Sequence, residues 1–128
     1  MKKVLIVDDS PTIVEITKAM LKEEGFEIDV ASNGAEALEK VKQFKPDLML
    51  LDIMMPDMDG YSVIKALRRE AGAGSPDYTK VIVVTSKDKM RDLFELEGIE
   101  GYLVKPFFRT ELMDRIAEVL GTDDDAEK

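Results

Sequence analysis

Three short apolar runs constrain the fold of this 128-residue chain more than any other feature. Residues 4–7, 48–51 and 81–84 are each four consecutive apolar residues, with no alternation of polar and apolar positions. Such runs are typical of strands buried on both faces, as in a parallel sheet. Stretches with helical spacing lie between them, so the sequence predicts an α/β fold with helices covering both faces of a parallel sheet.

Two further strands complete the predicted sheet. Residues 27–31 alternate between polar and apolar side chains, which indicates a half-exposed strand at a sheet edge. Residues 101–104 form a last strand that ends in Lys105. Five strands alternating with five helices, joined by right-handed crossovers, favour the strand order 2-1-3-4-5 because it places the second strand at an edge. The predicted fold class is therefore a three-layer (βα)5 sandwich.

Capping signals mark the starts of two predicted helices. Ser10 can cap the first helix, with Pro11 at its first position, and Asn33 with Glu36 forms a capping box for the second. A short helix is expected after Ser86. The helical spacing of the first helix predicts an inward face that consists of Ile13, Ile16, Thr17, Met20 and Leu21.

Composition narrows the chemistry that the chain can perform. It has no cysteine and no histidine, which excludes disulfides, thiol chemistry, imidazole bases and His-ligated zinc. Any phosphoryl transfer must then use a carboxylate or a hydroxyl, and any metal must be a hard cation held by oxygen. No apolar run approaches the roughly 18 residues of a membrane span, and no signal peptide is evident at the start. We expect a cytoplasmic protein with no membrane partner.

The net charge of −9 argues against a nucleic-acid partner, which would require a basic face. Residues 71–79 are rich in small residues and helix breakers, and we interpret them as a surface loop rather than a domain boundary. Residues 122–128 contain four acids and one lysine. We expect them to be a frayed, solubilising tail after a domain that spans residues 1–121, with a docking role as the alternative.

Polar residues follow four of the predicted strands where each leaves the core. Asp8 and Asp9 follow the first strand, Asp52 ends the third, Thr85 the fourth and Lys105 the fifth. Each residue alone has an ordinary structural explanation, such as solvation of a loop. Parallel strands, however, bring these positions to one edge, and ligands of open α/β sheets bind at that edge.

Three carboxylates in one cleft require a cation. Two of them about 4 Å apart repel by ~4 kcal/mol at an effective dielectric near 20, and a single lysine does not offset this. Mg²⁺ suits an oxygen-only ligand set that leaves room for waters and a phosphate oxygen, with Mn²⁺ as an alternative. A carboxylate nucleophile, an ammonium and a hydroxyl beside such an ion are the parts of phosphoryl transfer onto an aspartate.

Over residues 2 to about 120 the chain resembles the response-regulator receiver domain, of the chemotaxis and sporulation single-domain type. Four motifs in order at strand ends carry the resemblance, and together they are specific. They are VDDS at residues 7–10, LDIMMPDMDG at 51–60, VTS at 84–86 and YLVKPF at 102–107.

The resemblance implies a role for each acid. Asp52 would accept a phosphoryl group from a phosphohistidine, carried by a sensor histidine kinase or a histidine phosphotransfer protein. Asp9 would be the main side-chain ligand of Mg²⁺ and Asp8 would act chiefly through water. Asp52 and the backbone carbonyl of Met54 would complete the protein ligands, and Lys105 would bind the phosphate and Asp52.

The resemblance also implies a switch pair, Thr85 and Tyr102. Phosphorylation adds close to two negative charges, so the Thr85 hydroxyl gains by moving toward them and the Tyr102 ring can turn inward behind it. The face formed by the helix after Ser86, the last strand and the last helix would then repack and bind a downstream protein. The alternative for Tyr102 is an edge-strand aromatic ring packed on a helix. The bond from Lys105 to Pro106 is a candidate cis peptide.

Two departures from the family bear on phosphoryl lifetime and output. The span from Thr85 to Lys105 is somewhat short for the family, which predicts an atypical output face. Met54 and Lys87 occupy positions at which the family tunes the lifetime of its phosphoryl group. Met54 cannot orient an attacking water and Lys87 can interact with the phosphoryl group, so we expect slow self-dephosphorylation.

Other functions on this flavodoxin-like fold remain alternatives. An FMN-binding protein needs a phosphate loop after the first strand, where Asp8 and Asp9 would repel a phosphate. A haloacid-dehalogenase-type phosphatase needs its first two acids separated by one residue, and here they are adjacent. A non-phosphorylated interaction module, or a fragment of a larger regulator, would share all of these features. The sequence favours a signalling domain that assists its own phosphorylation and dephosphorylation over an enzyme.

Overall fold

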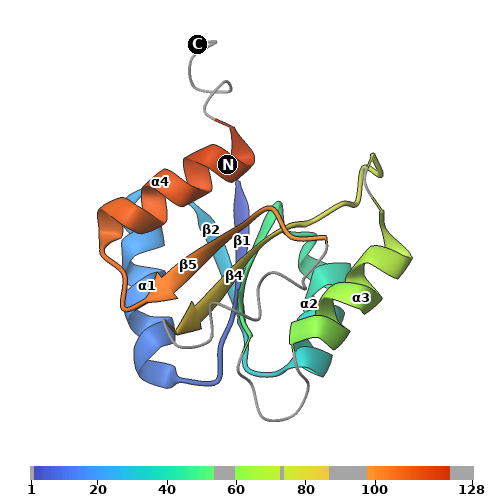
Figure 1. The fold of residues 1–128 in the computed structure, drawn as a ribbon, viewed down its shortest axis with the longest axis horizontal. Helices are drawn as coiled ribbons and strands as arrows, with labels where there is room; N and C mark the ends of the chain where they lie inside the picture. Colours follow the sequence, from blue (N-terminus) through green and yellow to red (C-terminus); the bar gives the residue numbers. More distant parts are fainter. Residues whose placement is uncertain (1, 54–59, 73, 87–97, 122–128) are drawn as a thin grey trace.

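Strands and helices alternate along the chain as the sequence predicts (Figure 1). The computed structural model describes residues 2–53, 60–72, 74–86 and 98–121. Its elements are β1 (Lys3–Val7), α1 (Pro11–Glu23), β2 (Glu27–Ala31), α2 (Gly34–Phe44), β3 (Leu48–Asp52), α3 (Gly60–Glu70), β4 (Lys80–Ser86), β5 (Gly101–Lys105) and α4 (Arg109–Leu120).

The five strands form one parallel sheet in the order β2-β1-β3-β4-β5, which confirms the predicted topology. Every residue of β3 is buried, as expected for a central strand with helices over both faces. β2 lies at an edge and is mostly half-buried, in agreement with its alternating sequence.

Helices cover the sheet on both faces and produce the predicted three layers. In Figure 1, α2 and α3 lie on one side of the strands, and α1 and α4 lie on the other. Two separate hydrophobic clusters fill the interfaces, one with side chains of α2 and α3 and one with side chains of α1 and α4. The helix predicted after Ser86 falls on residues 87–97, which lie outside the described residues.

The capping signals operate largely as predicted. The Ser10 hydroxyl accepts from the Ile13 N–H at 3.4 Å, and Oδ1 of Asn33 accepts from the Glu36 N–H at 2.8 Å. The Glu36 carboxylate returns to the N–H of Ser32 at 2.8 Å, one residue before the cap. These bonds satisfy N–H groups that have no partner within the helix, and they fix where α1 and α2 begin.

The inward face predicted for α1 is wrong at one position. Ile16 is 49% exposed, whereas Val14, Thr17 and Leu21 are the buried residues of this helix. The buried positions follow the i, i+3, i+7 spacing that starts at Val14, so the helix is rotated relative to the stripe that included Ile16.

Two lysines at the amino edge of the sheet bind the last carbonyls of helices. Nζ of Lys3, the first residue of β1, donates to the carbonyl of Phe44 at 3.2 Å, at the end of α2. Nζ of Lys80, the first residue of β4, donates to the carbonyl of Val119 at 3.0 Å, near the end of α4. A cation there satisfies carbonyls that have no partner within the helix and is favoured by the helix dipole.

Within the described ranges, none of the helices is both long enough and apolar enough to span a membrane.

Candidate functional site

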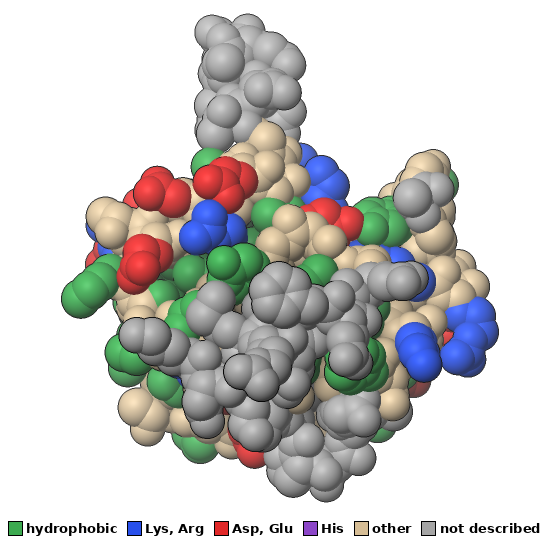
Figure 2. Space-filling view, viewed as in Figure 1, with side chains coloured by type: hydrophobic (Ala, Val, Ile, Leu, Met, Phe, Trp, Pro, Cys, Tyr) green, Lys and Arg blue, Asp and Glu red, His purple; other side chains and the backbone are tan. Residues whose placement is uncertain are grey.

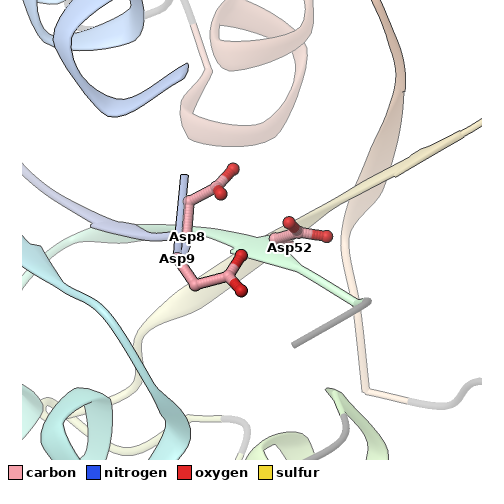
Figure 3. Close-up of side chains that lie close together, drawn as sticks. All are labelled: Asp8, Asp9 and Asp52. Carbon is pink, nitrogen blue, oxygen red and sulfur yellow. The ribbon is translucent and has the colours of Figure 1, made fainter. Parts of the chain in front are cut away.

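Three carboxylates meet at the carboxyl edge of the sheet. Asp8 and Asp9 directly follow β1, and Asp52 is the last residue of β3. These two strands are hydrogen-bonded neighbours, so their ends lie side by side. One carboxylate oxygen from each residue lies within 4.8 Å of the others, and Figure 3 shows the three side chains together at the two strand ends. Asp8 and Asp52 are buried, whereas Asp9 is exposed.

Lys105 brings a positive charge to the same place from β5. Its Nζ lies 3.0 Å from Oδ2 of Asp52 and 3.5 Å from Oδ2 of Asp8. Burial alone would lower the pKa of this ammonium, but the hydrogen bond and charge of Asp52 and the charge of Asp8 raise it above its ordinary value. Lys105 is therefore a permanent cation in the site.

Asp8 is held by a backbone group as well as by the lysine. The N–H of Ser10 donates to its Oδ1 at 2.9 Å. Burial raises the pKa of Asp8 and the Asp52 charge adds to this, while the Ser10 N–H and Lys105 act in the opposite direction; the net shift is upward. The sequence predicts only a capping role for Ser10, and its N–H also binds the Asp8 side chain two residues before it, as in an Asx turn.

The electrostatics and donor types of this site fit a hard divalent cation. Burial and the neighbouring Asp52 charge raise the pKa of Asp8 although Lys105 lies within 3.5 Å of it, so a further cation would favour its charged form. All three metal-ligand candidates are carboxylate oxygens, which Mg²⁺ and similar ions prefer. The predicted fourth protein ligand, the carbonyl of Met54, lies outside the described residues, as does Lys87.

The predicted switch residues occupy different environments. Thr85 is fully buried on β4, next to the residue that pairs with Asp52, and its hydroxyl donates to the carbonyl of Ser86 at 3.3 Å. Tyr102 is 41% exposed on β5, and its carbonyl accepts from Nε of Arg115 at 3.0 Å. Thr85 is thus buried one residue beyond the partner of Asp52 in the sheet, whereas Tyr102 is partly exposed on β5.

The backbone after Lys105 has the conformation that the sequence suggested. The Lys105–Pro106 peptide bond is cis.

Comparison with known proteins points to one family. The sequence model of the response regulator receiver domain matches residues 4–117 of this chain. The chain is 35% identical over 126 residues to the DNA-binding response regulator MtrA of Mycolicibacterium smegmatis. The aligned region covers 97% of this chain and 53% of MtrA. It therefore spans about half the length of that relative.

Solved structures agree with the sequence match. A CheY-like response regulator receiver domain protein from Methanospirillum hungatei superposes with a TM-score of 0.83 at 30% identity, covering 98% of both chains. The response regulator TrrA from Thermotoga maritima, determined in complex with Mg²⁺-BeF, superposes with a TM-score of 0.79 at 38% identity, covering 93% of this chain and 99% of TrrA.

The parallel sheet in the order 2-1-3-4-5, the acids and lysine at its carboxyl edge, and the match over residues 4–117 agree with one another. This chain belongs to the response regulator receiver domain family.

Proposed function

We propose that this chain is the phospho-accepting receiver of a two-component or phosphorelay system, with Asp52 as the acceptor. The observation that carries the proposal is the contact of Lys105 Nζ with Asp52 Oδ2 at 3.0 Å, inside a cluster whose three carboxylates lie within 4.8 Å. A sensor histidine kinase or a histidine phosphotransfer protein would supply the phosphoryl group. A carboxylate oxygen of Asp52 would form the new O–P bond while the N–P bond of the donor breaks and the imidazole leaves with the electron pair.

The side chains of Asp8, Asp9 and Asp52 would hold Mg²⁺, together with the carbonyl of Met54, and Mn²⁺ has the same preference for oxygen. The bound ion would neutralise charge on the oxygens of the transferred phosphoryl group. Lys105 would stabilise the same charge from β5, because its ammonium already contacts Asp52. Burial of Asp8 and Asp52 keeps these interactions strong by excluding water.

Incubation with a small acyl phosphate, with and without Mg²⁺, tests the proposal by intact mass. The wild-type chain should gain one phosphoryl group only when the metal is present, and Asp52→Asn should gain none. Asp77→Asn is the matched control, since it removes an acid from the exposed loop before β4 and should be modified like the wild type. Modification of Asp52→Asn, or of the wild type without metal, would contradict the assignment.

The output of the phosphorylated chain would be a protein contact rather than a catalysed reaction. We assign the switch to Thr85 and Tyr102 and the binding face to β5, α4 and the segment that precedes β5. Figure 2 shows part of this face, with acidic side chains along α4 and hydrophobic side chains between α4 and β5. The exposed rings of Tyr102 and Phe108 support a role in recognition, since aromatic residues are enriched in protein interfaces.

A nucleic-acid partner does not enter this proposal, because the chain carries a net charge of −9. MtrA is a DNA-binding response regulator, but this chain covers only 53% of it. A direct titration with duplex DNA at low salt tests the point, and salt-dependent binding by the phosphorylated chain would overturn it.

The proposed function also includes a long lifetime of the phosphoryl group on Asp52. Met54 and Lys87 would tune it, and slow self-dephosphorylation is expected because Met54 cannot position an attacking water. Decay of the phosphorylated wild type is to be compared with that of Lys87→Ala. Identical lifetimes would remove Lys87 from this role.

We also infer that residues 1–121 form the receiver domain of a cytoplasmic protein and that residues 122–128 are a solubilising tail. The family match over residues 4–117 supports the domain bounds. Removal of residues 122–128 should leave the free energy of unfolding and the rate of phosphorylation unchanged, and a loss of either would assign the tail a docking role.

A further inference from the structure

A cluster of three side chains joins α3, β4 and β5 at the amino edge of the sheet. We call it the Arg68 cluster, and it consists of Arg68, Tyr78 and Glu100. Nη1 of Arg68 donates to the Thr79 carbonyl at 2.7 Å and Nε donates to the Gly98 carbonyl at 2.9 Å. Nη2 contacts Oε1 of Glu100 at 3.2 Å. The planar guanidinium thus binds three acceptors from two separate segments, which a lysine ammonium has no fixed geometry to do.

Tyr78 closes the cluster from the loop before β4. Its ring centroid lies 3.9 Å from the guanidinium carbon of Arg68, and its hydroxyl donates to the Glu100 carboxylate. Burial and the hydrogen bond to Glu100 raise the pKa of the phenol, so Tyr78 remains a donor at neutral pH. The Arg68 cluster therefore combines a charged pair, a stacked ring and a second donor to the same carboxylate.

Glu100, held by Arg68 and Tyr78, binds the backbone at the start of the β4–β5 ladder. Its Oε1 accepts from the Val81 N–H at 2.7 Å, and its own N–H donates to the Val81 carbonyl at 2.9 Å. Both polar backbone groups of Val81 are therefore bound by one residue. Gly101 pairs with Ile82 directly afterwards, so the register of β5 begins at this contact.

Gly98 fits against the Arg68 cluster for two independent reasons. Its φ is +83°, in the left-handed region that favours glycine, and a Cβ would lie 3.2 Å from Cγ of Arg68. A side chain at this position would strain the backbone and press on Arg68, so the contact of Arg68 with the Gly98 carbonyl requires glycine here.

The register of β5 matters because Lys105 is its last residue. β5 is an edge strand of five residues that pairs only with β4, and Lys105 pairs with Ser86. A shift of one residue would move every β5 side chain to the opposite face of the sheet. The position of the Lys105 ammonium beside Asp52 thus depends on the pairing that Glu100 starts.

We propose that the Arg68 cluster sets the register of β5 and thereby holds Lys105 beside Asp52, so that Arg68 and Glu100 are positioning residues for phosphoryl acceptance. This inference rests on the function proposed above. It separates the site into two parts. The three acids lie at the ends of β1 and β3, which the Arg68 cluster does not contact, and only Lys105 lies on β5. Loss of the cluster should therefore affect phosphorylation and leave metal binding intact.

Arg68→Gln in the full chain is the first test. Its rate of phosphorylation by a small acyl phosphate at saturating Mg²⁺ should fall about tenfold, less than the ~10²-fold that a 1 Å misplacement of a catalytic group can cost. Its affinity for Mg²⁺ should be unchanged or higher, since a displaced Lys105 no longer repels the ion. Lys42→Gln is the matched control, because Lys42 is an exposed cation whose contact with Glu70 is 3.9 Å, and it should behave like the wild type.

A double variant tests whether the effect runs through Lys105. Arg68→Gln combined with Lys105→Ala should be no slower than Lys105→Ala alone, because the positioned group is already absent. If the two losses multiply, or if Arg68→Gln reacts at the wild-type rate, the positioning role is overturned. Tyr78→Phe, which keeps the ring and removes the hydroxyl, is a milder variant for use if Arg68→Gln does not fold, and it should slow the reaction two- to threefold.

Hydrogen exchange separates this inference from the proposed function. The amides of residues 101–105 should exchange about tenfold faster in Arg68→Gln than in Lys42→Gln, since the first contact of the ladder is lost. Unchanged protection would overturn the register argument even if the wild type is phosphorylated. The opposite outcome is also informative. If Arg68→Gln exchanges faster but the wild type takes up no phosphoryl group, the proposed function is contradicted and the role of the Arg68 cluster in setting the register is retained.

Discussion

The ammonium nitrogen of Lys105 lies 3.0 Å from Oδ2 of Asp52, although the two residues are 53 positions apart and β4 lies between their strands. The same nitrogen lies 3.5 Å from Asp8. One cation therefore contacts two buried acids, and a metal ion would enter a site that already contains a positive charge. Metal binding and phosphoryl acceptance should respond differently to the removal of that charge.

Lys105→Met should separate these two properties. Phosphorylation by an acyl phosphate should slow by about 10²-fold, because a preformed donor to the reacting group is lost. Mg²⁺ should bind at least as tightly as before, since a like charge has been removed from the site. Rates and calorimetric affinities check this, with Lys65→Met on the exposed face of α3 as control. Weaker Mg²⁺ binding in Lys105→Met would mean that the lysine organises the acids rather than the phosphoryl group.

Mg²⁺ should raise the free energy of unfolding. At a concentration 100 times the dissociation constant the gain should be about 2.7 kcal/mol, provided that the unfolded chain does not bind the ion. Asp8→Asn should be more stable than the wild type without metal, because it removes a buried charge that burial and Asp52 both disfavour. It should also respond less to Mg²⁺.

Urea unfolding with MgCl₂, against NaCl at equal ionic strength, measures both effects of this prediction. An equal rise in the free energy of unfolding in the two salts would mean that the salts act by screening charges, and it would argue against a specific metal site.

Thr85→Ala should separate phosphorylation of the chain from the conformational change that follows it. The variant keeps the acids and Lys105, so it should still gain one phosphoryl group. It lacks the hydroxyl that is expected to turn toward the phosphate, so amide chemical shifts of β5 and α4 should change less on phosphorylation than in the wild type. Thr85→Ser retains the hydroxyl and should respond like the wild type. Full shift changes in Thr85→Ala would remove this residue from the switch.

Gly60→Ala should destabilise the chain by about 1–3 kcal/mol, the usual range for inserting a methyl group into a packed region. A Cβ at Gly60 would lie 2.9 Å from Cγ1 and 3.3 Å from Cα of Ile53, and Cα belongs to the backbone and has little room to move. Gly72→Ala is the control, because its nearest neighbour would be the Arg68 carbonyl at 3.8 Å. Equal midpoints for the two variants in urea would show that Ile53 adjusts without cost.

The Asp29–Lys40 ion pair should stabilise the fold only above acidic pH. Burial raises the pKa of Asp29, but the hydrogen bonds from Lys40 and from the Val30 N–H lower it by more, so the net shift is downward. The contribution is therefore present at pH 7 and is lost as pH falls below about 3.9 through the folded-state pKa. The pair is partly exposed, so its size should be below about 1 kcal/mol.

Asp29→Asn and Lys40→Met should each show that loss at pH 7 and a smaller one at pH 3, and the double variant should lose no more than either single one. A difference that persists unchanged at pH 3 would assign the effect to packing.

Much of the fold and site follows from local sequence. The unbroken apolar runs indicate central parallel strands, and the alternation of residues 27–31 places β2 at an edge. Once the strand order is fixed, Asp8, Asp52 and Lys105 must meet, because each stands at the carboxyl end of its strand. The convergence was therefore predictable without any knowledge of side-chain contacts.

The features that escaped prediction depend on packing between distant segments. Ile13 and Ile16 fit a helical stripe as well as Val14 and Thr17 do, and only contact with the sheet decides which stripe of α1 is buried. The Arg68 cluster joins residues from three segments with no shared spacing, so no local pattern reports it.

The lysines that begin β1 and β4 affect which substitutions this fold tolerates. Lys3 and Lys80 secure the ends of α2 and α4 at the rim opposite the three aspartates. Replacement of side chains around the phosphorylation site should consequently alter reactivity without loosening either helix. Loss of these two helix contacts instead requires substitutions at the rim where Lys3 and Lys80 stand.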